Sequence, residues 1–555
     1  MSKESAGATG SATYTVSDAI VEGLVGAGVT AAYGVVSIHN LPIYEAMERN
    51  GAIRIVPARG ESGAVNMADA HARVSGGLGV AITSTGTGAG NAAGSLMEAW
   101  SAGTPVIHIT GQVHSAFIGT GQGYIHDCKD QLGMLESVGK AAFRLGRPNE
   151  ARAVISAAIN TALTPPRGPV SIEIPIDVQT QACQGGPFFF ESAHQISRDE
   201  HGLEDALELL KVARRPVIWA GGGAVSSGAG EEIAELAEKL CAPVITSQAG
   251  RGLMPENHPL CIGNFANFPE VSEFLQHCDL LLSVGVRFRS NETSAWRTRV
   301  PNIHIGIDAD LRALNRNYGH SLFLHGDARG YLTAILSRLS GVPSVADDYR
   351  REIARVRDGV RTRLRKQLGP YETIMDAMRY ALPRDAVIVR DVTVPSSAWG
   401  SRLLEIYQTR SSVHAAGGGI GQGLPMAIGA QIAAPDATVM LMVGDGGFLV
   451  NVGELATMAQ ENLPILIVLF DDGGYEVLRN IQENKYKRHI AVDLKSPDFV
   501  KLSESFGIET AVITSHAQFP AIFEQMVSKR EPALIVIDMS EVGQMAEAFA
   551  GPPGV

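Results

Sequence analysis

Two acidic turns in the last third of the chain carry the residue types of a magnesium site. The first turn is Gly444-Asp445-Gly446-Gly447, and the second is Asp471-Asp472-Gly473-Gly474-Tyr475. Asp445 and Asp472 offer carboxylate oxygens, and Gly474 offers a backbone carbonyl. Hard oxygen ligands of this kind suit Mg²⁺, which usually keeps phosphate oxygens and water in its shell. We therefore expect the two turns to share one Mg²⁺, while their glycines let backbone N–H groups approach a phosphate.

The sequence around these turns predicts the elements that bring them together. Thr438–Val443 and Ile465–Phe470 are short apolar runs typical of buried strands. Between the two runs, apolar residues recur at helical spacing from Phe448 to Ala459. Each acidic turn then follows a strand, at the edge of a parallel sheet where ligands bind. The alternative is a pair of acidic turn residues in an ordinary α/β domain that binds no metal.

The spacing resembles the thiamine diphosphate binding motif of the superfamily that contains acetolactate synthase and benzoylformate decarboxylase. Its parts are Gly444-Asp445-Gly446, the intervening residues 447–470, and Asp471-Asp472, where the family usually has Asn-Asn. The resemblance implies thiamine diphosphate and Mg²⁺ as cofactors and Asp445, Asp472 and Gly474 as the metal ligands. The cofactor-binding residues that it implies in these turns are Gly444, Asp445, Gly446, Gly447, Asp472, Gly474 and Tyr475. Asp472 adds one negative charge to the site, and its net effect on cofactor affinity stays open.

Glu61 is the predicted catalytic residue. It follows a short strand at Ile53–Val56, and it opens a helical Glu-x-x-Ala-x-x-Met-Ala pattern. In enzymes of the superfamily, a glutamate in this context bonds N1′ of the aminopyrimidine and supports general acid–base catalysis relayed through the cofactor. The alternative is a glutamate that stabilises the positive end of a helix dipole.

A glycine-rich loop, His414–Gly421, is expected to complete the cofactor site. By resemblance, the Gly418 carbonyl accepts a hydrogen bond from the 4′-amino group, and Ile420 lies under the cofactor and bends it. Plain core packing is the alternative for Ile420. The substrate pocket that we expect is lined by His39, Asn40, Gln122, Tyr124, His126, Val477 and Leu478. A structural role is the alternative for each of the two histidines.

The chain of 555 residues is long enough for three to four domains of about 150 residues each. Alternating strands and helices with short loops predict an α/β protein with parallel sheets covered by helices on both faces. With the resemblance, we expect three doubly wound domains: a pyrimidine-binding domain at 13–180, a central domain at 200–338 and a diphosphate-binding domain at 370–540. Acetolactate synthases hold FAD in the central domain. Here Gly221-Gly222-Gly223 lacks the GxGxxG pattern, so we expect a structural domain with a vestigial crevice and no FAD.

Composition narrows the class of partner. The formal net charge is −12, which argues against nucleic acid or an anionic membrane as the partner. No apolar run reaches transmembrane length, and Met1–Ala12 has no apolar signal core. Five scattered cysteines without a CxxC pair fit a reducing compartment. We expect a cytoplasmic protein that binds small molecules and copies of itself.

The resemblance implies an enzyme that makes or breaks a C–C bond next to a carbonyl. An acetolactate-synthase-like carboligase that decarboxylates a 2-oxo acid is the first hypothesis. A benzoylformate-decarboxylase-like enzyme and a lyase of 2-hydroxy ketones or diketones are alternatives, and a non-catalytic, cofactor-binding regulatory protein is the alternative of another class. The substrate stays open because Arg59-Gly60-Glu61-Ser62 departs from the Arg-His-Glu-Gln of acetolactate synthases. In the superfamily, Glu61 of one subunit faces the Asp445 domain of another, so we expect at least a homodimer and a homotetramer as the full assembly.

Overall fold

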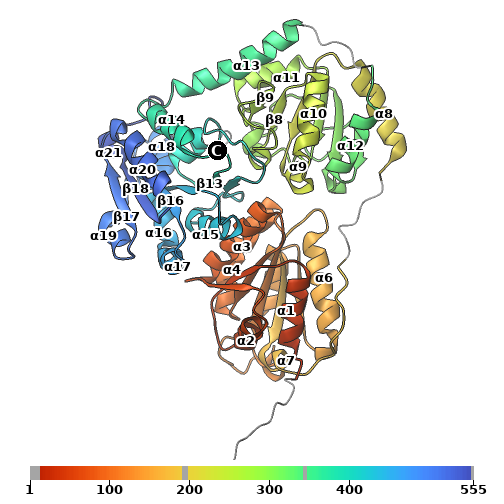
Figure 1. The fold of residues 1–555 in the computed structure, drawn as a ribbon, viewed down its shortest axis with the longest axis vertical. Coiled ribbons are helices and arrows are strands. Elements are labelled where there is room, and N and C mark those ends of the chain that lie inside the picture. Colours follow the sequence, from red (N-terminus) through yellow and green to blue (C-terminus); the bar gives the residue numbers. More distant parts are fainter. Residues whose placement is uncertain (1–12, 191–197, 342–346, 550, 552–555) are drawn as a thin grey trace, which may run out of the picture.

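The computed structural model describes residues 13–190, 198–341, 347–549 and 551. Within them lie three sheets of six strands each, and every strand pair between the named strands is parallel. Helices cover both faces of the sheets, which form three bodies along the chain (Figure 1). The predicted fold class, α/β with three parallel sheets, is confirmed.

The N-terminal sheet has the strand order β2-β1-β3-β4-β6-β5. Its strands are β1 (Ala31–Gly34), β2 (Arg54–Pro57), β3 (Gly79–Thr83), β4 (Val106–Gln112), β5 (Ala141–Arg144) and β6 (Val170–Pro175). Its helices are α1 (Val16–Gly26), α2 (Leu41–Asn50), α3 (Glu61–Ser75), α4 (Thr87–Ala102), α5 (Gln131–Val138), α6 (Ala151–Leu163) and α7 (Ile176–Gln179).

The central sheet has the order β12-β11-β10-β7-β8-β9, the doubly wound order of dinucleotide-binding folds. Its strands are β7 (Pro216–Ala220), β8 (Val244–Thr246), β9 (Cys261–Gly263), β10 (Leu280–Val284), β11 (Ile303–Asp308) and β12 (Leu322–His325). Its helices are α8 (Glu200–Val212), α9 (Gly222–Ser227), α10 (Gly230–Leu240), α11 (Pro269–Gln276) and α12 (Ala328–Arg338). The long helix α13 (Asp347–Arg365) then leads to the third sheet (Figure 1).

The C-terminal sheet, β14-β13-β15-β16-β18-β17, repeats the topology of the N-terminal sheet. Its strands are β13 (Val387–Arg390), β14 (Ser412–His414), β15 (Val439–Gly444), β16 (Ile465–Asp471), β17 (Glu509–Ile513) and β18 (Ala533–Asp538). Its helices are α14 (Tyr371–Ala381), α15 (Gly423–Ala433), α16 (Asp445–Val450), α17 (Leu455–Gln460), α18 (Glu476–Tyr486), α19 (Phe499–Glu504), α20 (Phe519–Lys529) and α21 (Met539–Val542). In both of these sheets, ligands are expected at the carboxyl ends of the strands, where the strand order reverses.

One predicted element is wrong in detail. The helical pattern from Phe448 to Ala459 predicts one helix, but the chain forms α16 and α17 with a 3₁₀ turn at Val452–Glu454 between them. The Glu454 carboxylate accepts hydrogen bonds from the backbone N–H groups of Arg59 and Gly60, each 3.1 Å to Oε1. The break therefore places a buried carboxylate against the residues that precede Glu61.

The C-terminal sheet packs against both of the other bodies. Alternate residues of β15 belong to different hydrophobic clusters: Leu441 lies in a cluster that includes α3, and Met440 lies in one that includes α13 and parts of the central body. Helices α3 and α15 lie side by side where the N-terminal and C-terminal bodies meet (Figure 1). No helix among the described residues is long and apolar enough to cross a membrane.

Candidate active site

The two acidic turns lie side by side at the carboxyl ends of β15 and β16. In these paired strands, Gly444 is opposite Phe470, so Asp445 and the pair Asp471-Asp472 follow at the same edge of the sheet. Asp445 is fully buried. The Ser496 hydroxyl lies 3.0 Å from Asp445 Oδ2 and 3.3 Å from Asp471 Oδ1, and donates to these carboxylates.

Negative charge is crowded at this edge. Burial, and then the charges of Asp445 and Glu476, raise the pKa of Asp472 to about 8. Burial and the charge of Asp471 raise the pKa of Asp445, and burial raises that of Glu476. The positive charge of Arg479 lowers the pKa of Asp472 and so opposes the shift, but its Nη1 lies 3.7 Å from Asp472 Oδ1, which makes a long ion pair. The carboxylates are therefore poorly compensated by the protein itself.

The same residues fit a divalent cation bound together with a diphosphate. Asp445 Oδ1 and Asp472 Oδ1 are buried and accept no hydrogen bond, and the latter has only the longer ion pair with Arg479, so each oxygen can serve as a metal ligand. Side chains in the described ranges form no group of three or more His, Cys, Asp or Glu ligands arranged for a metal, so backbone, phosphate and water oxygens must complete a magnesium shell here. A Cβ at Gly446 would lie 2.6 Å from the Tyr475 ring, which shows why the turn requires glycine.

The glycine-rich loop is fixed at its end and open in its middle. Asp391 accepts hydrogen bonds from the backbone N–H groups of Gly421 and Gly423, at 3.3 and 2.7 Å. Burial raises the pKa of Asp391 to about 6, although these N–H groups oppose the shift. Gly418 has a φ of +83°, and Ile420 is 38 % exposed. Plain core packing, the alternative for Ile420, therefore does not describe its position.

Glu61 is the first residue of α3, and Asn91 Nδ2 donates to its Oε2 at 3.2 Å. A Cβ at Gly88 would lie 2.9 Å from Glu61 Oε1, so the glycine-rich segment 84–91, a turn that leads into the first residues of α4, makes room for this carboxylate. The His126 carbonyl lies against Gly86 in the same turn, and the rings of His39 and His126 have their centroids 5.1 Å apart. The fold thus gathers Glu61 and both predicted histidines around one turn.

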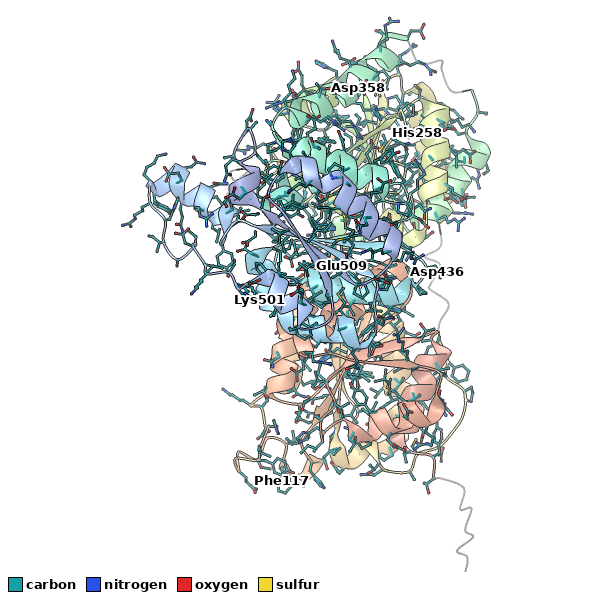
Figure 2. The ribbon with its side chains drawn as sticks, turned by 60° about the vertical axis from the view of Figure 1, so that its left-hand side comes forward. Phe117, His258, Asp358, Asp436, Lys501 and Glu509 are labelled. Carbon is teal, nitrogen blue, oxygen red and sulfur yellow. The ribbon has the colours of Figure 1, made fainter. Side chains whose placement is uncertain are left out.

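The other predicted pocket residues do not all join this group. Both polar ends of the Asn40 side chain serve its own loop, accepting from the Ser37 N–H at 2.8 Å and donating to the Val35 carbonyl at 3.0 Å. Tyr124 stacks on Phe117 with centroids 4.7 Å apart, and Figure 2 shows Phe117 at the outer end of the N-terminal body. Asn40 and Tyr124 are thus held by contacts within the N-terminal body, and their place in the substrate pocket stays a prediction. Gln122 is exposed, Val477 is half-buried and Leu478 is exposed on α18.

Sequence reasoning missed several residues of the site. Ser496 holds the two carboxylates but lies far along the chain from either turn. Thr393 has a buried hydroxyl without a hydrogen-bond partner, and a Cβ at Gly444 would lie 3.0 Å from it. Asn451 donates to the Gly421 carbonyl at 2.5 Å. Only Thr393 carries a sequence signal, since Asp391-Val392-Thr393 follows a predicted strand as the two acidic turns do.

A cavity of about 740 Å³ opens at the carboxyl ends of β7 and β10, between the central body and residues 102–103 and 165–167 of the N-terminal body. Its lining includes Gly223, Gly285, Arg287, Arg289 and His414. The volume lies in the range of small-molecule sites, so the crevice expected to be vestigial is a roomy one. The absence of FAD stays a prediction.

Comparison with known proteins agrees with this arrangement. Three models of the thiamine pyrophosphate enzymes match the chain: the N-terminal TPP binding domain at residues 14–134, the central domain at 203–335 and the C-terminal TPP binding domain at 394–537. Fold, site and models together define a thiamine diphosphate-dependent enzyme of the carboligase and decarboxylase class. The chain belongs to the thiamine pyrophosphate enzyme family, as its motifs predicted.

Three relatives match along nearly their whole length. A probable 2-ketoarginine decarboxylase of Pseudomonas aeruginosa is 33% identical over 506 residues, covering 89% of each chain. A probable acetolactate synthase large subunit of Methanocaldococcus jannaschii is 31% identical, covering 97% of this chain and 93% of the relative. The acetolactate synthase isozyme 2 large subunit of Escherichia coli is 29% identical, covering 94% and 95%.

Proposed function

We propose that this enzyme binds thiamine diphosphate with Mg²⁺ through the two acidic turns. Asp445 and Asp472 supply carboxylate oxygens, and the Gly474 carbonyl supplies the third protein ligand. The observation that carries this proposal is the buried, poorly compensated cluster at the ends of β15 and β16, where Asp445 and Asp472 each keep an oxygen that accepts no hydrogen bond. The remaining turn residues, Gly444, Gly446, Gly447 and Tyr475, shape the space for the diphosphate.

Glu61 is the proposed acid–base residue. Thiamine diphosphate supplies a nucleophilic carbon and an electron sink when it is bound. Asn91 bonds one oxygen of Glu61, which fixes the orientation of the carboxyl group and leaves Oε1 facing Gly88. Glu61 then holds or releases one proton at a defined place, as general acid–base catalysis requires.

The proposed reaction is decarboxylation of a 2-oxo acid followed by addition to a second carbonyl, as the names of the acetolactate synthase relatives suggest. Simple decarboxylation is the second candidate, because the relative at 33% identity is a probable 2-ketoarginine decarboxylase. Val477 and Leu478 on α18 would form an apolar wall of the pocket, and His39 and His126 its polar side.

We also propose that the active unit is a homodimer, assembled further into a homotetramer in the cytoplasm. Within the described residues, no hydrogen bond joins Glu61 to the proposed cofactor residues of the C-terminal body. Gly418 and Ile420 are exposed in the single chain, as are the apolar side chains of Ile38 and Ile125. A second copy would cover such surfaces and bring its own Glu61 to the loop. Light scattering over a range of protein concentrations tests this assembly, and a monomer at all concentrations contradicts it.

The function is tested by CO₂ release from pyruvate, branched-chain, aromatic and guanidino 2-oxo acids, with thiamine diphosphate and Mg²⁺ present. We expect release from at least one acid, and a loss of roughly 10²–10⁴-fold in Glu61→Gln. Glu200→Gln is the matched control, because Glu200 also opens a helix, α8, in the central body. Product analysis then separates carboligation from decarboxylation. Equal rates in wild type and Glu61→Gln would contradict the role of Glu61.

If no acid releases CO₂ while the cofactor binds, the lyase or the non-catalytic alternative replaces the proposal. The same assay is repeated after the metal is removed by chelation and after Mg²⁺ is added back. Activity that persists after exhaustive chelation would contradict the role given to Asp445 and Asp472.

A further inference from the structure

Glu98 of α4 reaches from the N-terminal body into the glycine-rich loop of the C-terminal body. It is 2 % exposed, and its two carboxylate oxygens accept hydrogen bonds from two consecutive backbone N–H groups of that loop. Oε1 accepts from the Ala416 N–H, and Oε2 accepts from the Gly417 N–H at 2.8 Å. A carboxylate bonded to two neighbouring amides fixes both the position and the rotation of the peptide between them.

Two arginines hold the same segment. Arg73, on α3, donates to the His414 carbonyl at 2.6 Å and lies 3.4 Å from Glu98 Oε1. Arg289, from the central body, donates to the carbonyls of Ala416 and Ser101. The segment His414–Gly417 is therefore fixed by side chains from both of the other bodies.

The held segment comes directly before the two loop residues of the proposed cofactor site. Gly418 and Ile420 lie between this attachment and the one that Asp391 makes at Gly421. The middle of the loop is exposed in the single chain, so within one subunit its position depends on the two attachments.

We propose that Glu98 is a positioning residue for the cofactor. By fixing the amides of Ala416 and Gly417, it places the Gly418 carbonyl and the Ile420 side chain where they meet the aminopyrimidine. The inference rests on the proposed function, because it gives that loop its role toward thiamine diphosphate. It goes further by naming a residue outside the cofactor motifs, in a different body, that acts only through backbone amides.

Gly417 offers an independent way to disturb this contact. A Cβ at Gly417 would lie 2.7 Å from Glu98 Oε2, so Gly417→Ala must push the carboxylate away. The ion pair between Arg73 and Asp69, 2.5 Å long, stays intact in that variant. Glu98→Gln tests the same contact from the other side, because an amide nitrogen cannot accept from the second N–H group.

The experiment compares two probes by isothermal titration in the presence of Mg²⁺. Thiamine diphosphate reports the whole site, whereas inorganic pyrophosphate reports only the acidic turns. We expect both Glu98→Gln and Gly417→Ala to weaken the binding of thiamine diphosphate by about tenfold, equal to about 1.4 kcal/mol of binding free energy. Both variants should keep the wild-type affinity for pyrophosphate.

Glu461→Gln is the matched control. The Glu461 carboxylate also joins the C-terminal body to the N-terminal one, through Arg54 at 2.7 Å, but it does not touch the loop. We expect this variant to bind both probes as wild type does. Unchanged thiamine diphosphate affinity in Glu98→Gln and Gly417→Ala would overturn the inference. An equal loss for both probes would overturn it too, because it would indicate a general structural effect. Failure of the wild type to bind pyrophosphate would instead overturn the diphosphate site of the proposed function.

Discussion

Gly429 of α15 lies so close to Met67 of α3 that a methyl group on Gly429 would overlap the Met67 carbonyl oxygen. The backbones of the two helices touch here without an intervening side chain. We expect Gly429→Ala to lower the free energy of unfolding by about 1–3 kcal/mol, because the helices must move apart. Chemical denaturation measures this change.

Gly359→Ala is the control for that variant. Gly359 lies in α13 with open space around its Cα, so alanine should stabilise the helix by about 0.4–1 kcal/mol. Equal effects of the two substitutions would contradict the close contact between α3 and α15.

Asp472→Asn should change the response of the protein to Mg²⁺. In the metal-free protein, burial and then the charges of Asp445 and Glu476 raise the pKa of Asp472 to about 8, so at pH 7 the folded chain keeps a proton on this carboxyl group that the unfolded chain releases. An amide carries no such cost, so we expect Asp472→Asn to make the metal-free protein more stable at pH 7. The gain should be about 2–4 kcal/mol at pH 7, because each pH unit above the usual pKa of an aspartate costs the folded chain about 1.4 kcal/mol. The rise in melting temperature on adding Mg²⁺ with thiamine diphosphate should then be smaller than in wild type.

Asp493→Asn is the matched control for the charge argument. Asp493 pairs with Arg479 at 3.0 Å but is largely exposed and lies outside the cluster. It should leave the response to Mg²⁺ unchanged. If Asp472→Asn also leaves it unchanged, the extra charge is screened.

Ile420→Ala should separate binding from stability. Because Ile420 is 38 % exposed, its truncation should lower the free energy of unfolding by less than about 1 kcal/mol. The same truncation should weaken the binding of thiamine diphosphate. Ile428→Ala in α15 is the comparison: Ile428 is fully buried, and its loss should cost about 2–5 kcal/mol. Denaturation and cofactor titration on both variants check this, and undiminished cofactor binding by Ile420→Ala would refute the role of Ile420.

His108 should make the protein sensitive to acid. Burial lowers its pKa to about 3, and its ring bonds the hydroxyls of Thr83 and Ser171 at 2.9 and 3.0 Å. Between pH 6.5 and about 3, the unfolded chain binds a proton at this histidine that the folded chain does not. The contribution of neutral His108 to stability is therefore complete above pH 6.5 and is lost as the pH falls.

The measurement is the pH dependence of unfolding in wild type and His108→Gln. Between pH 6 and pH 4, the unfolding free energy of wild type should fall more steeply than that of the variant, by about 1.4 kcal/mol for each pH unit. Parallel curves would contradict this, because they would show that His108 binds its proton over the same pH range in the folded and the unfolded chain.

The long buried strands were predictable because their apolar runs are strong local signals. Some short edge strands, such as Ser412–His414, carry too few apolar residues to be recognised, although the short edge strand expected at Ile53–Val56 is present as β2. The break between α16 and α17 was not predictable either, since it places Glu454 against Arg59 and Gly60, almost 400 positions earlier.

The same distinction applies to the site. Glu61, Asp445 and Asp472 could be proposed from the sequence because motif residues are close in sequence and limited in type, and their roles stay predictions. Glu98 and Ser496 were not found, because each acts on residues that only the folded chain brings near. Whether a polar side chain is already used by its own loop, as Asn40 is, also requires the three-dimensional contacts.

The C-terminal sheet has consequences for how the chain unfolds. Each of its faces belongs to a hydrophobic cluster that continues into a neighbouring body, the α13 side into the central body and the α15 side into the N-terminal body. The N-terminal and central bodies, in contrast, each keep one cluster of their own. This sheet cannot unfold without exposing apolar surface on both neighbours. On heating, the three bodies should therefore unfold together in one cooperative transition. Substitutions in the outer helices of the flanking bodies should affect the stability of one body, whereas substitutions in the C-terminal sheet should affect the stability of all three.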